Sequence, residues 1–571
     1  HERVEVEVDE ATQGVRRVPM TAVGGGWWLA PVDHAGPGTR YRFSVDGGPP
    51  RPDPRSRWQP DGIDGPSALV GDDGFTWSDH AWQGARLASA VVYEMHVGTF
   101  TEGGTFDAAI EHLDHLVDLG VTAIEVLPVA EFSGDRGWGY DGVLLWAPHH
   151  AYGGPDGFKR LVDAAHGRGL AVILDVVYNH LGPAGNYLAE YGPYFTDRYQ
   201  TPWGSAVNFD GDGSDEVRRF VIDNASMWLA CYHVDGLRLD AVHAIYDDSA
   251  LPILEELAVA VSGLADRLGR PLWLIAESDR NDPRLVTARE AGGHGLDASW
   301  NDDFHHALHA VLTGERGGYY EDYGTLAQVA RALEQVYVYG RDFSPFRNRH
   351  HGRPAGGLPR GRFLAYLQNH DQVGNRAVGE RSAALMSPGR LKIGAALVLC
   401  GPCVPMLFQG EEWAASTPFQ YFTDHRHPDL GRAVSEGRRS EFSAFGWSAD
   451  DVPDPQDPAT RDRSVLQWAE VDAPVHQEIL SWHRELIALR RSWPELADGT
   501  RPNTRAVVDE DAGWLQMRRG RLQVTVNLAT EVRRVALPAP GSLLLGSDQQ
   551  ARVENGAVVL GPDSVAVTGS E

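Results

Sequence analysis

Eight short apolar runs, separated by amphipathic stretches, occupy the middle of the chain. The runs cover residues 91–97, 121–129, 170–177, 234–242, 272–276, 296–300, 363–367 and 404–408, and amphipathic stretches such as 108–119, 158–166, 216–230 and 250–268 lie between them. Continuous apolar runs of this length are typical of strands that are buried on both faces. Helices between such strands connect them as right-handed crossovers in a parallel sheet. Eight such units in one domain predict a (β/α)₈ TIM barrel.

The two ends of the chain show a different pattern. Residues 1 to about 88 alternate apolar and polar side chains, as at Val4, Val6 and Val8, between Gly/Pro turns, and this predicts a β-sandwich. The pattern after about 491 is again typical of β-strands, as at 514–518 and 522–526. Since single hydrophobic cores rarely exceed about 250–300 residues, we predict three domains. These are an N-terminal β-sandwich over 1–88, a barrel with enlarged loops over 89–490 and an all-β domain over 491–571.

The composition excludes several classes of protein. The chain has 51 Lys+Arg against 79 Asp+Glu, a formal net charge of −28, and such a protein repels the phosphates of nucleic acid. The most apolar stretch, 393–408, is interrupted by Gly401, Pro402 and Pro405 and is too short to cross a membrane. Three cysteines cannot build a disulfide framework, which favours a reducing compartment. We therefore expect a cytoplasmic protein without nucleic-acid or membrane partners, and a monomer.

Polar residues stand where several of the apolar runs end. They are Asp175, Asn179 and His180 after the third run, Arg238, Asp240 and His243 after the fourth, Glu277 after the fifth, and Asn369, His370 and Asp371 after the seventh. The C-terminal ends of barrel strands meet on one face, where active sites are built. One Asp in such a place can be a helix N-cap. Three carboxylates from three strands indicate chemistry instead, because gathering them costs desolvation and repulsion.

Two carboxyl groups that differ in pKa suit glycoside hydrolysis, in which one attacks and the other donates a proton. Arg238 lies two residues before Asp240 and shares its strand face, so the guanidinium can hold Asp240 ionised. Glu277 follows the apolar run 272–276 and has no cation adjacent in sequence, which favours its protonated form. The residues therefore predict Asp240 as the nucleophile and Glu277 as the acid/base.

These segments resemble, in order, the four signature regions of the α-amylase superfamily of glycoside hydrolases. The resemblance implies the same roles for Asp240 and Glu277, and it makes Asp371 a third carboxylate that holds sugar hydroxyls. It further implies sugar contacts by Tyr140, His180, Arg238 and His370, with Asp175 and Asn179 as structural support. No cofactor and no metal ligand is predicted, although some relatives hold calcium near the position of Asn179.

Longer stretches narrow the resemblance. Residues 93–100 resemble the branch shared by glycogen branching enzymes and trehalose-releasing hydrolases. More particularly, residues 151–158, 179–187, 300–306, 369–376, 438–442 and 452–458 look like those of the maltooligosyltrehalose trehalohydrolase family. Asn369, Gln372 and Asn375 lie in these stretches and are predicted to bind substrate. The family implies an immunoglobulin-like N-terminal sandwich and retaining hydrolysis of the α-1,4 bond next to a terminal trehalosyl unit. Maltooligosyltrehalose and maltooligosaccharides are then the expected partners.

Two segments differ from a plain amylase or invite other interpretations. Many α-amylases carry Lys-His at the third and fourth positions after the nucleophile, where this chain has His243 and Ala244. We therefore expect His243 to contact the leaving group, a packing or capping role being the alternative. The polar run 301–306 follows the sixth predicted strand, so Asp302, Asp303 and His306 are predicted sugar contacts. A metal site there, or a helix cap by Asn301 or Asp302, is the alternative.

Other functions remain open at this stage. A 1,4-α-glucan branching enzyme would use the same nucleophile with a sugar acceptor, and a non-catalytic glucan-binding protein would lack one of the carboxylates. Cys400-Gly-Pro-Cys403 matches a redox motif, but it precedes a predicted strand, whereas redox pairs follow a strand and open a helix. We therefore expect no redox function.

Overall fold

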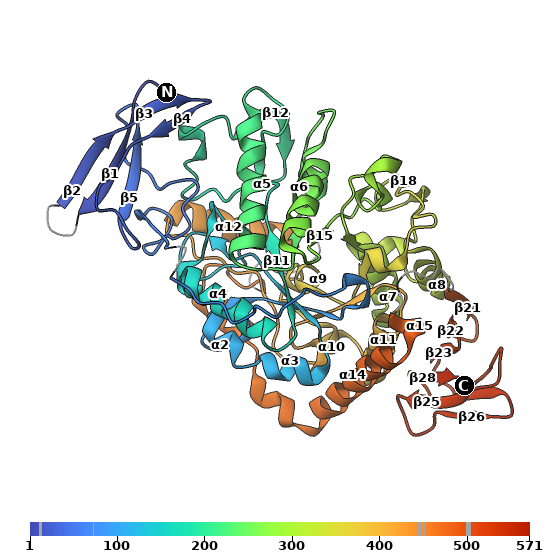
Figure 1. Cartoon of the computed structure of the whole chain (residues 1–571). Coiled ribbons are helices and arrows are strands. Elements are labelled where there is room, and N and C mark those ends of the chain that lie inside the picture. The colour runs from blue at the N-terminus through green and yellow to red at the C-terminus, as the bar shows by residue number, and fades with distance from the viewer. Residues whose placement is uncertain are drawn as a thin grey trace.

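A closed barrel of parallel strands forms the centre of the molecule (Figure 1). The computed structural model describes residues 1–571 except 11–13, 72–73, 444–447, 449–450, 498, 500–503 and 571. The strand order around the barrel is β11-β14-β15-β16-β19-β20-β7-β8. The bounds are β7 Val92–Met95, β8 Ala123–Val126, β11 Ala171–Val176, β14 Gly236–Leu239, β15 Trp273–Ala276, β16 Ala298–Trp300, β19 Phe363–Ala365 and β20 Val404–Phe408. Each strand lies in one of the eight apolar runs, and the predicted barrel is confirmed.

Helices surround the barrel because each has one apolar face. In α4 (Gly154–His166) the buried residues Phe158, Leu161, Val162 and Ala165 recur at helical spacing and pack toward the strands. Other helices of the outer layer are α3 (Leu113–Leu119), α5 (Ser214–Cys231), α6 (Ile253–Leu268), α7 (Asp302–Thr313), α8 (Leu326–Gln335), α11 (Pro388–Leu399) and α14 (Pro474–Ser492). Among the helices of the described ranges, none is long and apolar enough to cross a bilayer.

Two hydrophobic cores lie on opposite faces of the barrel strands. Along β11, Val172 and Leu174 belong to the large cluster shared with the helices, while Ile173 belongs to a smaller cluster that includes Trp300. Alternation of this kind follows from the two-residue period of a strand. The smaller cluster fills the inside of the barrel, and polar residues of the same parity, such as Asp175 and Arg238, point to that inside as well.

The β-rich ends of the chain are also confirmed. The N-terminal region contains an antiparallel sheet of order β2-β1-β5-β6, with β1 at Val4–Glu10, β2 at Gly14–Pro19, β5 at Arg40–Val45 and β6 at Ser67–Ala68. The C-terminal region contains a five-stranded sheet, β21-β22-β23-β28-β25, and a three-stranded sheet, β24-β27-β26, between Thr504 and Gly569. The two regions lie at opposite ends of the molecule (Figure 1). The domain boundaries at 88 and 490 stay predictions.

Several hairpins in the loops were not predicted. They are β9 (Ala130–Glu131) with β10 (Leu144–Pro148), β12 (Phe195–Thr201) with β13 (Gly204–Val207), and β17 (Asp342–Ser344) with β18 (Arg349–His351). β12 follows β11 in the chain, and its residues are exposed or half-buried rather than buried. A short, largely exposed hairpin lacks the apolar periodicity on which sequence analysis depends.

A segment before the barrel, residues 77–82, is fastened across the N-terminal ends of the strands; we call it the strap. His166 is fully buried between two carboxylates, with Nδ1 at 2.9 Å from Asp79 and Nε2 at 2.9 Å from Asp235. Asp235 also accepts hydrogen bonds from Trp82 and Arg270. Both ring nitrogens of His166 are therefore within hydrogen-bond distance of carboxylate oxygens. The strap is therefore held by charge-assisted hydrogen bonds in the interior.

Candidate active site

Arg238 connects the carboxylates at the ends of β11 and β14. Its guanidinium is fully buried, and Nη1 donates to Asp175 Oδ2 at 2.8 Å and to Asp240 Oδ1 at 2.7 Å. Asn179 Nδ2 donates to the other oxygen of Asp240 at 2.7 Å. Both oxygens of Asp240 thus accept hydrogen bonds from buried donors, the arrangement that an ionised carboxylate favours. The predicted supporting residues, Asp175 and Asn179, both lie in this network.

Arg238 and Asp175 form a buried ion pair beneath the site. Burial raises the pKa of Asp175 to about 6, although Arg238 opposes the effect. Burial also disfavours the charged form of Arg238, but Asp175 and neighbouring groups hold its pKa well above its usual range. The guanidinium carbon lies 4.3 Å from the ring centroid of Trp300, a cation–π contact in a dry interior. A permanent positive charge is therefore fixed next to Asp240.

Glu277 is the second carboxyl group, at the end of the neighbouring strand β15. Burial, with Asp240 nearby, raises its pKa well above the usual range, which favours its protonated form. The sequence showed no cation near it, yet the fold brings Arg238 Nη2 to 3.7 Å from Glu277 Oε2. Arg238 does lower this pKa, but burial outweighs it. The protonated form of Glu277 that was inferred from the sequence is therefore supported. The reason is burial, and not the absence of a nearby cation.

A strained residue holds Glu277 in place. Ala241, directly after Asp240, has φ 39° and ψ 50°, a left-handed conformation that costs a non-glycine residue about 1–3 kcal/mol. In this conformation its backbone N–H donates to Glu277 Oε2 at 2.6 Å. The strain is compensated by a hydrogen bond that links the ends of β14 and β15, and the two carboxyl groups are held in one relative position.

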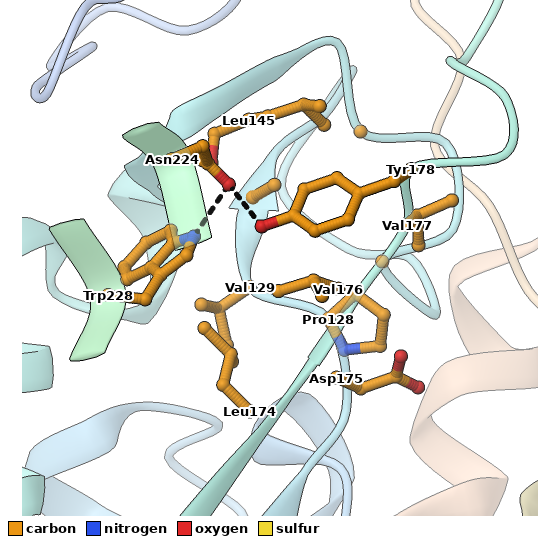
Figure 2. Close-up of a pocket in the computed structure, with 13 residues that line it drawn as sticks. Pro128, Val129, Leu145, Leu174, Asp175, Val176, Val177, Tyr178, Asn224 and Trp228 are labelled. Carbon is orange, nitrogen blue, oxygen red and sulfur yellow. Dashed lines mark hydrogen bonds between the residues drawn. The ribbon is translucent and has the colours of Figure 1, made fainter. Parts of the chain in front are cut away.

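The loop that carries Asn179 and His180 is anchored below the site. The Tyr178 hydroxyl donates to Asn224 Oδ1 at 2.7 Å, and Trp228 Nε1 donates to the same oxygen at 3.1 Å, as Figure 2 shows. Asn224 Nδ2 in turn donates to the Leu145 carbonyl at 3.0 Å. All three polar side chains are buried and bonded, so the backbone entering the loop is rigid.

Asp371 lies at the start of a short helix, α9 (His370–Gly374). Asn369 caps this helix by accepting from the N–H groups of Asp371 and Gln372, and the Gln372 side chain completes a capping box. The Asp371 side chain is 43% exposed, and Asn375 Nδ2 donates to it at 3.3 Å. Asn369 is thus used as a helix cap, and its Nδ2 finds no hydrogen-bond partner among the described residues. Asp371 stands at the rim, open to a ligand.

Tyr140 and His370 lie together above Asp175. Their rings are stacked, with centroids 5.2 Å apart and planes at 16°. The Tyr140 hydroxyl donates to Asp175 Oδ2 at 2.6 Å and lies 2.8 Å from His370 Nε2. The fold therefore brings both predicted sugar contacts into one network with Arg238 and Asp240.

His180 contacts an aromatic residue that the sequence analysis missed. Its ring stacks on Trp203, with centroids 4.5 Å apart and planes at 13°. Trp203 follows β12 at the tip of the hairpin with β13 and is 49% exposed. A half-exposed indole beside a predicted site residue is a typical sugar-stacking surface. The only signal in the sequence was a Trp in a Pro-Trp-Gly turn.

The polar run at the start of α7 is divided between two environments. Asp302 accepts from the Tyr366 hydroxyl at 2.5 Å and from Gln372 at 3.4 Å, and burial raises its pKa to about 6. Asp303 instead accepts from the backbone of Val338 and Tyr339 and from the Tyr323 hydroxyl. The fold thus places Asp302 next to Gln372 of the site, whereas the contacts of Asp303 lie in the body of the protein.

The two predicted residues that remain are histidines, of which His306 is buried and His243 is half-buried. His306 packs against Tyr319 with centroids 4.6 Å apart, and burial lowers its pKa to about 3. Burial also lowers the pKa of His243, so both rings are neutral at physiological pH. The carbonyl of His243 accepts from Arg280 Nη2 at 2.7 Å. His243 and Arg280 line a cavity of about 280 Å³ beside β14 and β15, together with Ser278, Asp282, Arg284 and His294.

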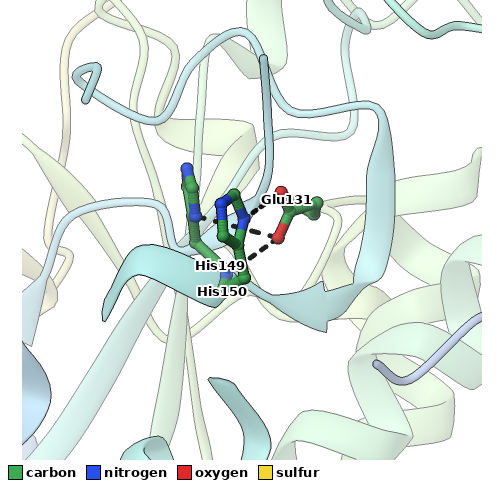
Figure 3. Close-up of side chains that lie close together, drawn as sticks. All are labelled: Glu131, His149 and His150. Carbon is green, nitrogen blue, oxygen red and sulfur yellow. Dashed lines mark hydrogen bonds and ion pairs between the residues drawn. The ribbon is translucent and has the colours of Figure 1, made fainter. Parts of the chain in front are cut away.

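One group within the described ranges has metal-ligand composition, and it lies apart from the predicted run. Glu131, His149 and His150 offer ligand atoms within 4.8 Å of one another (Figure 3). His150 Nδ1 lies 2.7 Å from Glu131, and His150 Nε2 lies 3.2 Å from Asp135. His149 Nδ1 accepts from the backbone of Ala151 at 3.1 Å. Internal hydrogen bonds thus hold the three residues together, while His149 Nε2 has no partner among the described residues.

The Cys400–Cys403 pair is unsuited to redox chemistry. Both residues are buried free thiols at the start of β20. Burial raises the pKa to about 12 for Cys400 and about 11 for Cys403. Since the thiolate is the reactive form, these cysteines are inert packing residues.

The chain is similar to known proteins in both sequence and fold. A family model described as "Alpha amylase, catalytic domain" matches residues 71–201. A malto-oligosyltrehalose trehalohydrolase of Arthrobacter ramosus is 50% identical over 97% of this chain and 96% of its own length, and one of Mycobacterium tuberculosis is 49% identical over 92% and 91%. A crystal structure from Salmonella typhimurium, assigned provisionally as an α-amylase, has a TM-score of 0.90 at 39% identity and covers 100% of this chain and 98% of that one. The chain therefore belongs to the malto-oligosyltrehalose trehalohydrolase family of α-amylase-type glycoside hydrolases.

Proposed function

We propose that this protein hydrolyses the α-1,4-glucosidic bond next to the terminal trehalosyl unit of maltooligosyltrehalose and releases trehalose. The observation that carries the proposal is the pair of strand-end carboxyls in different surroundings: Asp240 accepts from Arg238 and Asn179, whereas burial raises the pKa of Glu277. The names of relatives that match nearly the whole chain supply the substrate class.

The first step uses both carboxyl groups together. The Glu277 O–H donates its proton to the glycosidic oxygen while an Asp240 oxygen attacks the anomeric carbon. The bond from that carbon to the glycosidic oxygen breaks, and trehalose leaves as a neutral molecule. A glycosyl ester on Asp240 remains. The neutral form of Glu277 is needed for this step, and burial supports it.

The second step reverses the proton transfer. Glu277, now ionised, takes a proton from water, and the water oxygen attacks the anomeric carbon from the face that trehalose left. The ester bond to Asp240 breaks and a shortened maltooligosaccharide leaves. Two inversions retain the α configuration. Asp371, at the exposed rim, accepts from sugar hydroxyls in both steps.

The surrounding residues divide between the two sides of the cleaved bond. Tyr140, His180 and His370 would enclose the glucosyl ring, because they lie around Asp175 and Asp240. His243, Arg280 and the cavity beside them would receive the trehalose, since they lie just past the ends of β14 and β15. Asp302 and Gln372 would contact hydroxyls near Asp371. We further propose that the protein is cytoplasmic and monomeric. Size-exclusion chromatography with light scattering is the direct test of the monomeric state.

The test is a product assay with two substrates. The protein is incubated with maltooligosyltrehalose and, separately, with amylose, and products are identified by chromatography. Free trehalose from the first substrate is expected, and new α-1,6 branches in amylose would instead identify a branching enzyme. Asp240→Asn is expected to lower turnover by at least about 10³-fold. Asp114→Asn, which removes an exposed carboxylate from α3, is the matched control and is expected to leave turnover unchanged. Equal activity of Asp240→Asn and the wild type would contradict the enzyme assignment.

A further inference from the structure

Glu94 is a buried carboxylate in the middle of β7, beneath the site. It is 1% exposed, and both of its oxygens face His370. Oε2 accepts from the His370 backbone N–H at 3.0 Å, and Oε1 lies 2.6 Å from His370 Nδ1. The two residues are 276 positions apart in sequence, so only the closed barrel brings them together.

In the hydrogen bonds that join Glu94, His370, Tyr140 and Asp175, the position of each proton follows from which atoms can only accept. Tyr140 has one hydroxyl proton, and it points to Asp175 Oδ2, which cannot donate when ionised. The Tyr140 oxygen must therefore accept from His370 Nε2 at 2.8 Å. His370 Nδ1 must likewise donate to Glu94, because a carboxylate only accepts. Both nitrogens of His370 carry protons, and the ring is an imidazolium.

We propose that Glu94 is a positioning residue for the glycosidase reaction, which holds His370 in its doubly protonated form and thereby orients the Tyr140 hydroxyl toward Asp175. The inference rests on the proposed function for the reaction that it serves. Without the Glu94 charge, His370 would be neutral, and its bare Nε2 would compete with Asp175 for the Tyr140 proton. A chain of hydrogen bonds then connects β7 to the nucleophile. It runs in the order Glu94, His370, Tyr140, Asp175, Arg238 and Asp240.

The charges around His370 agree with this assignment. Burial lowers the pKa of His370, but Glu94 and Asp371 outweigh burial, so the pKa lies above its ordinary value. The titratable and charged groups that face the ring from the packed elements are Glu94 on β7, His96 after β7, Tyr140 in the loop after β8, Asp175 on β11, Arg238 on β14 and Asp371 on α9. Of the carboxylates, Glu94 is the one in hydrogen-bond contact with Nδ1.

The barrel supplies a matched control in Glu125. Glu125 lies on β8 directly opposite Glu94 in the strand register and is also 1% exposed. Burial, with Glu94 beside it, raises its pKa well above the usual range, which favours its neutral form. Its Oε2 has no hydrogen-bond partner among the described residues. Replacing Glu125 by Gln thus changes a neighbouring buried side chain without removing a charge.

The experiment measures kcat/KM and kcat from pH 5 to 9 for the wild type, Glu94→Gln and Glu125→Gln. For Glu94→Gln we expect kcat to fall at least about tenfold at pH 8, a much smaller loss at pH 5.5, and an alkaline limb displaced toward acid by about 1 pH unit or more. Glu125→Gln should keep the wild-type profile. A loss in Glu94→Gln that is the same at every pH, or an equal displacement in Glu125→Gln, would overturn the proposal.

A second measurement does not depend on turnover or on the folding of Glu94→Gln. The ¹⁵N spectrum of histidine-labelled wild type at pH 7.5 should contain an imidazolium signal that is missing from His370→Asn. A neutral tautomer at that position would reject the proposal. Trehalose release by the wild type is scored separately, so a failure of the proposed function is distinguished from a failure of the role of Glu94.

Discussion

The guanidinium of Arg238 donates to Asp175 and to Asp240, but it only approaches Glu277, at 3.7 Å. This difference of about 1 Å gives two neighbouring buried carboxyls different surroundings, one hydrogen-bonded to a cation and one not. Charge-assisted hydrogen bonds fall off steeply with distance, whereas burial acts on both groups. The contacts of Arg238 thus distinguish the nucleophile Asp240 from the acid Glu277. Each of the two roles can be tested separately.

The two roles respond differently to the leaving group. With maltooligosyltrehalose, Asp240→Asn and Glu277→Gln should each lower kcat by at least about 10³-fold. With α-maltosyl fluoride, whose leaving group needs no proton, Glu277→Gln should recover much of the first step while Asp240→Asn should not. A fluoride-release assay checks this. Equal losses of both variants on the fluoride would contradict the assignment of Glu277 as proton donor.

The pH dependence of activity follows from the same groups. Asp175 must be ionised to accept from Tyr140 and Arg238, and its pKa of about 6 means that kcat/KM should fall as the pH drops through about 6. Glu277 and His370 must both be protonated, so activity should fall again as the pH rises through the lower of their two raised pKa values. A bell-shaped profile is expected.

Asp302 has a pKa in the same range and supplies the control. If Asp175 sets the acid limb, Asp302→Asn should keep that limb near pH 6 even if KM rises. Loss of the limb in Asp302→Asn would instead assign it to Asp302.

At the scale of elements, the short helix η9 (Glu411–Trp413) after β20 carries a buried acid with a structural role. Glu411 Oε2 accepts from the Phe408 N–H at 3.2 Å, and burial raises the pKa of Glu411 to about 8. The folded state therefore binds a proton that the unfolded chain releases near pH 4.5. Its contribution to stability is present below that pH and is lost as the pH rises through about 8.

Glu411→Gln should weaken this dependence. Between pH 5 and 9 the variant is expected to lose about 4 kcal/mol less stability than the wild type, because the amide keeps the acceptor and has no proton to lose. Thermal unfolding followed by circular dichroism at the two pH values measures the difference. Parallel losses in both proteins would show that Glu411 does not titrate in this range.

At the scale of the whole molecule, the strap joins the N-terminal region to the barrel through Asp79, His166 and Asp235. Removing one partner of a buried ion pair leaves the others uncompensated and costs about 3–5 kcal/mol. His166→Gln should therefore lower the unfolding midpoint at pH 7 without altering the pH profile of kcat, since the strap lies at the opposite ends of the strands from the site. Denaturant unfolding and kinetics check the two parts. An altered pH profile would show that the strap communicates with the active site.

Much of this arrangement could be predicted from the sequence, because it depends on local patterns. Buried parallel strands are continuous apolar runs, and all eight barrel strands were found on that basis. Arg238 and Asp240 were paired correctly because residues two apart share a strand face. The convergence of strand ends placed Asp175, Glu277 and His370 near them.

The rest depends on contacts between distant segments. Trp203 reaches His180 on a hairpin without apolar periodicity, and Arg238 reaches Glu277 at the end of the neighbouring strand. Asp302 and Asp303 are adjacent, yet one faces Gln372 and the other faces Tyr323, because the helix turns between them. Glu94 left one signal, a charge inside the apolar run 91–97, but its partner lies far along the chain.

The pairing of β7 with β20, which closes the barrel, has a consequence for biosynthesis. β7 hydrogen-bonds with β20, so that Val92 pairs with Met406 and Glu94 with Phe408. A nascent chain that has not reached residue 404 exposes the edge of β7, and contacts this distant in sequence make folding slow and aggregation-prone. Nucleophile, acid and Arg238 have by then all been synthesised, yet no partial activity can precede closure. We therefore expect catalytic competence only after β20 has paired with β7, once residue 408 has been synthesised, and chaperone demand should be greatest just before that pairing.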